Sequence, residues 1–282
     1  MPYFDGVAGR AYFRAWQVPP PRLAALVFLH GFGEHSGLYH RLGNALAASG
    51  IELWAVDEIG HGLTDGARAV IESIDDLVEN GRRLTALAEA AEPGGPVFLA
   101  GHSLGAAAAA LSASRDPGAY QGLILSGAPL SPLAWVTELG AADADDGLAL
   151  DPADLSADPF YLDELATDPL AFTSAAGAQT LLDTLPPAWA ELPGRFDGIS
   201  LPVLFVHGTQ DPIVPVTDAR DWSARVPGGR IAEFEGARHD VLNETVHREV
   251  ATTIAQFVRS VAEPADRRPA DEYRATSVRS TR

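Results

Sequence analysis

The stretch Gly101-His102-Ser103-Leu104-Gly105 lies between a short apolar run, Pro96–Ala100, and an alanine-rich segment, Gly105–Ala113. The apolar run predicts a buried β-strand, and the alanine-rich segment predicts a helix packed closely against a sheet. A G-x-S-x-G pentapeptide between a strand and a helix is typical of a sharp turn that exposes a serine hydroxyl. Glycine on both sides removes Cβ atoms that would collide in such a turn. Because the chain contains 27 Gly, the inference depends on the flanking elements and not on the pentapeptide alone.

Short apolar runs alternate with longer segments of helical period on both sides of this turn. The alternation predicts an α/β domain with a mostly parallel sheet flanked by helices. The early run Ala11–Trp16 is expected to form an antiparallel strand, and helical periodicity is expected over 74–87 and Val241–Val261. The expected parallel strands are Leu23–Leu29, Ile51–Val56, Pro96–Ala100, Gly122–Leu125, Leu201–Val206 and Arg230–Phe234.

Two regions depart from this alternation. Residues 128–195 interrupt the core, which is expected to comprise 1–127 and 196–261, and a long insertion of this kind predicts a cap or lid. Residues 129–195 contain twelve Asp or Glu and a single Arg, a net charge of −11. Residues 262–282 lack apolar periodicity and predict a disordered tail.

Composition excludes several classes of protein. The 282 residues are 46% hydrophobic with a mean hydropathy of +0.02, which is ordinary for a globular protein. We expect a cytoplasmic protein, since the start has no signal-peptide pattern and no apolar run reaches the roughly 20 residues of a membrane span. The absence of Cys excludes disulfides and a cysteine nucleophile, and a net charge of −18 argues against nucleic-acid binding.

A serine nucleophile requires a base, and the base requires an orienting acid. Asp211 follows the expected strand Leu201–Val206, and His239 follows Arg230–Phe234. Both positions lie at carboxyl ends of strands, where parallel sheets build their sites, and their order after Ser103 is acid and then histidine. We therefore predict Ser103 as nucleophile, His239 as base and Asp211 as orienting acid.

The loop His30-Gly31-Phe32-Gly33 follows the strand Leu23–Leu29, where this architecture supplies an oxyanion donor. The predicted donors are the backbone N–H groups of Phe32 and Leu104. His30 is expected to shape the loop and receives no proton-transfer role. A metal site at His61, His102 and Asp57 would lack recognisable ligand spacing, so we expect no metal and no cofactor.

Together these residues resemble the α/β-hydrolase fold, and within it the monoacylglycerol lipase and lysophospholipase-like serine hydrolases. The most specific stretch is His30-Gly31-Phe32-Gly33-Glu34-His35-Ser36-Gly37, and the match runs from about Ala11 to Val261. The resemblance implies the triad and oxyanion donors already predicted, and an acyl pocket under the cap. It also makes Glu34 and His30 candidate substrate-binding residues, although Glu34 could equally be a carboxylate that orders the loop.

Three positions depart from the family pattern. Leu38 stands where the family often has Arg, and Leu242 stands where some members have a polar group for the glycerol head. Ala106 replaces a second glycine of the elbow, which is a change between small residues. The two leucines put recognition of glycerol in doubt but leave ester cleavage unaffected.

The expected function is cleavage of carboxylic esters through an acyl-enzyme, of the monoacylglycerol lipase type. A lysophospholipase or a broad carboxylesterase is the alternative, and a non-catalytic ligand-binding protein of the same fold is a remote one. The expected partner is a small uncharged lipid-like ester, because the acidic cap repels anions, with at most transient membrane contact through the cap. Apolar cap residues that could line the acyl channel are Trp135, Leu148, Leu150, Phe160, Tyr161, Leu165, Phe172, Leu181, Leu182 and Trp189.

Overall fold

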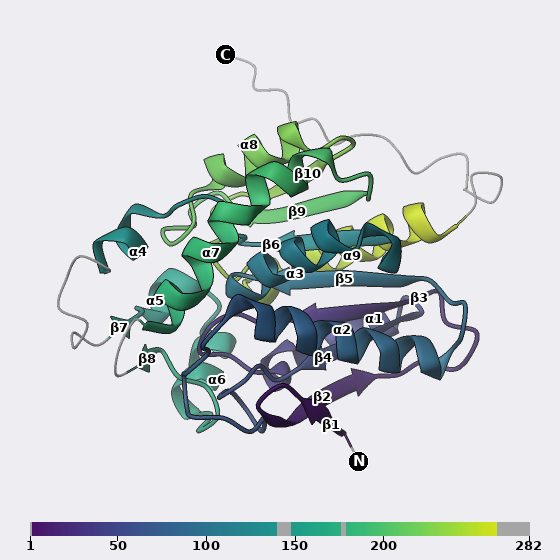
Figure 1. The fold of residues 1–282 in the computed structure, drawn as a ribbon, viewed down its shortest axis with the longest axis horizontal. Helices are drawn as coiled ribbons and strands as arrows, with labels where there is room; N and C mark the ends of the chain where they lie inside the picture. The colour runs from purple at the N-terminus through teal and green to yellow at the C-terminus, as the bar shows by residue number, and fades with distance from the viewer. Residues whose placement is uncertain (1, 140–147, 176–178, 264–282) are drawn as a thin grey trace.

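A computed structural model describes residues 2–139, 148–175 and 179–263. Eight strands within these ranges form one sheet in the order β1-β2-β4-β3-β5-β6-β9-β10 (Figure 1). All neighbouring pairs from β4 to β10 are parallel, whereas β1–β2 and β2–β4 are antiparallel. The strands are β1 (Tyr3–Gly6), β2 (Gly9–Trp16), β3 (Ala24–Leu29), β4 (Ile51–Val56), β5 (Val97–His102), β6 (Gly122–Ser126), β9 (Val203–Gly208) and β10 (Arg230–Phe234). A mostly parallel sheet was the expected fold class, and it is confirmed.

Helices cover both faces of the sheet. One apolar core joins it to α2 (Ile74–Ala91), α3 (Leu104–Arg115), α7 (Gln179–Arg195) and α8 (Val216–Arg225). A second core on the other face contains α1 (His40–Ala47) and α9 (His247–Ala262). Strands β3 to β6 are buried along their whole lengths because both faces are covered, which explains their nearly continuous apolar sequences.

The expected cap region contains four helices and a small two-stranded antiparallel sheet among its described residues. They are α4 (Ala134–Leu139), β7 (Leu148–Ala149), α5 (Pro152–Leu155), α6 (Pro159–Thr167), β8 (Ser174–Ala175) and α7. Figure 1 shows α4, α5 and α6 beyond one end of the sheet, while α7 runs across its helical layer. Since α7 packs against α2 and α3, we propose that the cap proper ends before α7.

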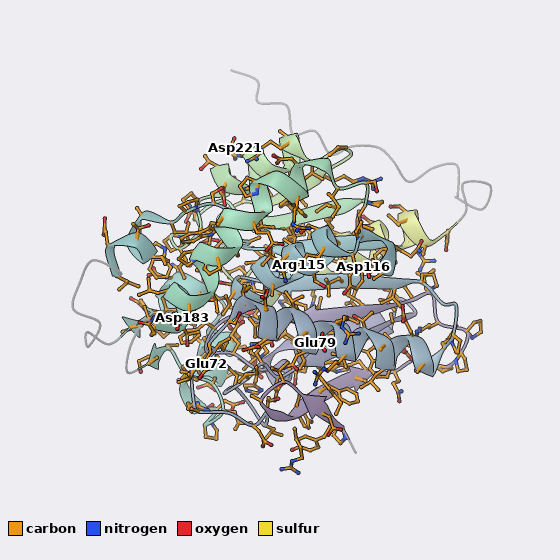
Figure 2. All side chains as sticks on the ribbon, viewed as in Figure 1. Glu72, Glu79, Arg115, Asp116, Asp183 and Asp221 are labelled. Atoms are coloured by element: carbon orange, nitrogen blue, oxygen red, sulfur yellow. The ribbon has the colours of Figure 1, made fainter. Side chains whose placement is uncertain are left out.

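On the outer, charged face of the helical layer, Arg115 at the end of α3 links α3 to α2 and α7 (Figure 2). Its guanidinium donates to Glu191 of α7 at 2.7 and 2.8 Å and to Asp75 of α2 at 2.7 Å. The three helices are therefore joined by ion pairs on the outside as well as by the apolar core beneath them.

Several element predictions need revision. The expected helix Val241–Val261 is instead a 3₁₀ turn, Val241–Asn243, followed by α9 from His247, because the chain first turns tightly behind His239. Strand β1 and helices α1 and α8 were not predicted. The expected tail lies outside the described residues apart from 262–263. No helix within the described ranges is long and apolar enough to cross a membrane, and the expected cytoplasmic location stays a prediction.

Candidate active site

Ser103 sits at the predicted strand–helix turn, between β5 and α3. Its φ of 50° and ψ of −120° place a non-glycine residue in a strained backbone region, which is the geometry expected of an exposed nucleophile. The turn is held because the Ser103 N–H donates to the Ser126 carbonyl of β6 at 2.9 Å. Its carbonyl accepts from Ala106 and Ala107, so the strain is balanced by the helix that follows.

The two glycines of the turn are required by packing. A Cβ on Gly101 would lie 2.3 Å from the carbonyl oxygen of Gly105. A Cβ on Gly105 would lie 2.2 Å from the carbonyl oxygen of Leu29, at the end of β3. Ala106 is completely buried, so the departure from the family pattern at this position is accommodated by the core.

Asp211 and His239 lie together, with His239 Nδ1 2.8 Å from Asp211 Oδ2. The other carboxylate oxygen accepts the N–H groups of Ile213 and Val214, both at 2.9 Å. Burial alone would raise the pKa of Asp211, but the His239 and His207 rings beside it outweigh burial and hold the pKa well below its usual range. Asp211 is therefore ionised. Because His239 bonds to Asp211 through Nδ1, its other ring nitrogen, Nε2, faces away from Asp211.

Ser103 and His239 line one pocket, together with the two predicted oxyanion donors Phe32 and Leu104. The Ser103 hydroxyl forms no hydrogen bond to the described residues. Polar side chains are few in this pocket: besides Ser103 and His239, only Glu34 and His102 line it. The apolar residues that line it are Leu104, Pro129, Leu133, Trp135, Leu150, Leu155, Leu181, Leu185, Ile213 and Val214. Of the predicted channel residues, Trp135, Leu150 and Leu181 are present, whereas Phe160 is 52% exposed.

His30 is buried and bonds to the backbone through both ring nitrogens. Nε2 accepts the Glu58 N–H at 2.8 Å, so Nδ1 carries the proton and donates to the Gly31 carbonyl at 2.7 Å. Burial lowers the pKa of His30 to about 3, which keeps the ring neutral. His30 does not line the pocket, and we propose that it shapes the loop rather than contacting substrate.

Glu34 is buried beneath the pocket and holds several groups together. Oε2 accepts the Gly31 N–H at 2.8 Å and the Tyr39 hydroxyl at 2.6 Å, and Oε1 accepts the Tyr161 hydroxyl at 2.8 Å. Burial and the nearby Asp240 carboxylate raise the pKa of Glu34 to about 8, although these three hydrogen bonds oppose the shift. The arrangement favours the loop-ordering role that was one of the two predicted for this residue.

One group among the described residues could hold a metal ion, formed by Glu34, His102 and Asp240, whose ligand atoms lie within 4.8 Å of one another. Both Glu34 oxygens already accept hydrogen bonds, and His102 Nδ1 pairs with the Ser126 hydroxyl at 3.1 Å. Asp240 Oδ2 accepts from the Asn243 amide at 2.9 Å, whereas Asp240 Oδ1 has no hydrogen-bond partner among the described residues. The departures Leu38 and Leu242 are both buried in the second core and do not line the pocket.

Two residues at the site were not predicted, and a third, Tyr161, was expected only to line the acyl channel. His207 Nε2 lies 3.1 Å from Asp211 Oδ2. Gly127 lies against the His239 ring, where a Cβ would lie 3.0 Å from Cε1. Tyr161 reaches Glu34 from the cap. His207 precedes the acid loop and Gly127 directly follows β6, so their positions at strand ends were the only available signal.

The strained serine, the histidine–carboxylate pair and the sheet order together define a protein of the α/β-hydrolase fold. The chain matches the family model for serine aminopeptidase S33 hydrolases over residues 20–246 and belongs to that family. This match confirms the resemblance expected from the motifs.

Relatives and solved structures agree with this assignment. A monoacylglycerol lipase of Mycolicibacterium smegmatis is 28% identical over 91% of this chain and 96% of its own. The crystal structure of the Paleococcus ferrophilus monoacylglycerol lipase is 27% identical, with a TM-score of 0.72 over 89% of this chain and 98% of that one. A soluble variant of monoglyceride lipase from Saccharomyces cerevisiae shares the fold, with 20% identity and a TM-score of 0.79 over 93% and 95% of the chains.

Proposed function

We propose that the chain cleaves uncharged carboxylic esters of the monoacylglycerol type through an acyl-enzyme, with Ser103, His239 and Asp211 as the triad. The observation that carries the proposal is the 2.8 Å bond between His239 Nδ1 and Asp211 Oδ2, at the rim of the pocket that Ser103 also lines. The lipase relatives support an ester rather than an amide as substrate.

In this mechanism His239 removes the Ser103 proton as the hydroxyl oxygen attacks the ester carbonyl. The ionised Asp211 holds the imidazole and stabilises its cation. The N–H groups of Phe32 and Leu104 receive the oxyanion, and neither donates a hydrogen bond to another group in the described part of the chain. The loss of one such donor typically costs about 10² to 10³ in rate. His239 then protonates the leaving alcohol and activates the water that releases the acid.

The apolar pocket supports an acyl chain as the bound group. Leu104, Leu181 and Leu185 would contact the chain on the side of α3 and α7. Because Leu38 and Leu242 replace polar groups of the family, we expect less discrimination for glycerol than for the acyl chain. A lysophospholipase or a broad carboxylesterase therefore stays the second candidate, and the substrate panel below distinguishes them.

A fluorophosphonate probe tests the nucleophile directly. We expect the wild-type protein to be labelled and Ser103→Ala to be unlabelled. Ser114→Ala is the matched control, because its hydroxyl donates only to the Leu111 carbonyl at the far end of α3. A folded wild-type protein without labelling would contradict the proposal and favour a non-catalytic member of the fold.

The substrate panel comprises monoacylglycerols and p-nitrophenyl esters of graded chain length, one lysophospholipid and leucine p-nitroanilide. We expect esters to be hydrolysed, with preference set by acyl length, and the anilide to be left intact. Faster turnover of the lysophospholipid than of every neutral ester would replace the proposed substrate class. Cleavage of the anilide alone would identify a peptidase.

A further inference from the structure

Residues 153–172 of the cap, which we name the brace, contact both loops of the proposed catalytic machinery. The brace contains the end of α5, all of α6 and the turn after it. One contact surface is the loop around Phe32, and the other is the loop that carries His239.

On the oxyanion side, the brace is bonded through the two neighbours of Phe32. The Tyr161 hydroxyl donates to Glu34 Oε1, and Glu34 Oε2 accepts the Gly31 N–H, each at 2.8 Å. On the other side of Phe32, the Gly33 carbonyl accepts the Phe172 N–H at 2.8 Å. The Gly31 N–H is therefore held by Glu34, which Tyr161 holds in turn, and the Gly33 carbonyl is held directly by Phe172.

Aromatic packing adds a third restraint on Phe32. The Phe172 ring lies edge-on to the Phe32 ring at 5.3 Å and also contacts His61 at 5.0 Å. Arg68 lies over Phe172 at 4.6 Å and donates to the carbonyls of residues 169–171 at 3.2 Å. Gly33 has a φ of +87° and no room for a Cβ, because the Phe172 carbonyl oxygen occupies that position.

On the histidine side, α5 holds the backbone around His239. The Asp240 N–H donates to the Leu155 carbonyl at 2.8 Å, and the His239 N–H lies 3.4 Å from the Asp154 carbonyl. The Arg238 guanidinium donates to the carbonyls of Ala153 and Ser156. The loop that presents the base is thus bonded to the same short segment as the oxyanion loop.

The central contact of the brace, between Tyr161 and Glu34, is buried. Tyr161 is completely buried and Glu34 is 4% exposed, so separating them would leave Glu34 Oε1 and the Tyr161 hydroxyl without this hydrogen bond in a buried setting. A lid that swung away in each turnover would break all of these bonds together. The contacts instead indicate a segment that remains docked.

We propose that the brace is a fixed positioning element for catalysis, in which Tyr161 and Phe172 hold the Phe32 N–H in place for the oxyanion. This inference rests on the proposed function. Tyr161 is a positioning residue, since it acts through Glu34 and does not line the pocket. Misplacement of a catalytic group by about 1 Å can cost on the order of 10²-fold in rate, so a partial loosening of the loop would lower kcat more than it changes KM.

The test compares Tyr161→Phe with wild type. The change removes only the hydroxyl that bonds to Glu34. Tyr120→Phe is the matched control, because Tyr120 is also buried and its hydroxyl pairs with Ser112 at 3.1 Å, away from the site. Asp168→Asn is a second variant: Asp168 accepts from His35 Nε2 at 3.0 Å and is on the partly exposed end of the brace, so the change preserves shape.

Four quantities are measured: kcat and KM for a p-nitrophenyl ester, and the affinities of two inhibitors. An alkyl trifluoromethyl ketone forms a hemiketal oxyanion with the nucleophile, whereas a fatty alcohol of equal length occupies the acyl pocket alone. We expect Tyr161→Phe to lower kcat and to weaken the ketone by about tenfold each, with KM and alcohol binding within about twofold of wild type. Tyr120→Phe should change none of these.

The outcomes separate the two proposals. If wild type hydrolyses the ester while Tyr161→Phe and Asp168→Asn both retain wild-type kcat and ketone binding, the brace is overturned and the proposed function stands. Equal weakening of the ketone and the alcohol would also overturn it, since that pattern indicates a lid for binding. If Tyr161→Phe does not fold, the same comparison of kcat and ketone binding with KM and alcohol binding is made on Asp168→Asn. A wild-type protein that neither hydrolyses esters nor binds the ketone overturns the proposed function itself.

Discussion

His207 Nε2 lies 3.1 Å from Asp211 Oδ2, the oxygen that also pairs with His239. The same His207 nitrogen lies 2.8 Å from the Val214 carbonyl. Because both neighbours are acceptors, Nε2 carries the proton and donates to them. Asp211 is therefore held by two imidazoles on one oxygen and by two backbone N–H groups on the other, and its orientation is fixed on every side.

This arrangement predicts the effect of Asp211→Asn. The amide can keep the backbone bonds of Oδ1, but an amide nitrogen facing His239 Nδ1 forces the wrong tautomer of the base. We expect kcat to fall by about 10⁴-fold with little loss of stability. The control is Asp218→Asn, a mostly buried carboxylate that bonds to Ser131 away from the pocket. Steady-state kinetics check the prediction, and a loss of less than about tenfold would remove Asp211 from the triad.

Gly127→Ala should displace the His239 ring without changing the chemistry of the imidazole. A Cβ at this position would lie 3.0 Å from His239 Cε1 and 3.1 Å from Nδ1, so the ring must move. We expect kcat to fall by about 100-fold. Gly228→Ala is the control, since it has a positive φ of 72° with open space around it. Both variants should lose about 1 kcal/mol from the left-handed backbone, and equal kinetics of the two would contradict the prediction.

The sheet, and the positions of the proposed triad residues at its edge, were predictable because each depends on a local signal. Buried parallel strands are continuous apolar runs, and Ser103, Asp211 and His239 each follow such a run at the edge where the strands end. The antiparallel edge strand β1 has only four residues and partly exposed side chains, so it carries no such pattern.

The positioning residues were not predictable for a different reason. Tyr161 and Glu34 are 127 positions apart, and their hydrogen bond depends on how the cap docks on the core. Nothing in the local sequence around Tyr161 indicates a polar partner, because the same residue suits an apolar cap helix. For His30, which the sequence predicted as a loop-shaping residue and the family resemblance as a substrate-binding one, the choice depends on the backbone partners of its two ring nitrogens.

Acid should destabilise the protein through its neutral buried histidines. Burial lowers the pKa of His30 and of His61 to about 3, against 6.5 in the unfolded chain. Between these values the unfolded state binds more protons than the folded state. The contribution of these histidines to the free energy of unfolding is therefore fully present above pH 6.5 and decreases as the pH falls toward 3. Each histidine contributes a slope of about 1.4 kcal/mol per pH unit. Denaturant unfolding of His61→Asn should show a slope lower by about that amount between pH 6 and 4, and an unchanged slope would contradict the assignment.

Arg115→Met should weaken the outer helical layer without affecting catalysis. The arginine pairs with Glu191 through two bonds and with Asp75 through one, and it is partly buried. We expect a loss of about 1 kcal/mol at low salt that shrinks at 1 M salt, with kcat unchanged. Arg82→Met is the control, because its pairing with Glu79 is exposed and within one helix, and it should cost about 0.3 kcal/mol. A loss for Arg115→Met that does not depend on salt would indicate packing of the side chain rather than its charge.

Charge discrimination between substrates should have two separable parts. The net charge of −18 repels anions at long range, which lowers their association rate in a manner that salt screens. The pocket opposes anions at short range, because its lining is apolar apart from Ser103, His239, Glu34 and His102. The cost of desolvating an anion there does not depend on salt.

The matched substrates are p-nitrophenyl hexanoate and the mono-p-nitrophenyl ester of a dicarboxylic acid of equal length. At low salt we expect kcat/KM to favour the neutral ester by at least about 100-fold, and at 0.5 M salt the ratio should fall by about tenfold but not vanish. A ratio near one at low salt would contradict both parts, and a ratio that salt leaves unchanged would assign the whole preference to the pocket.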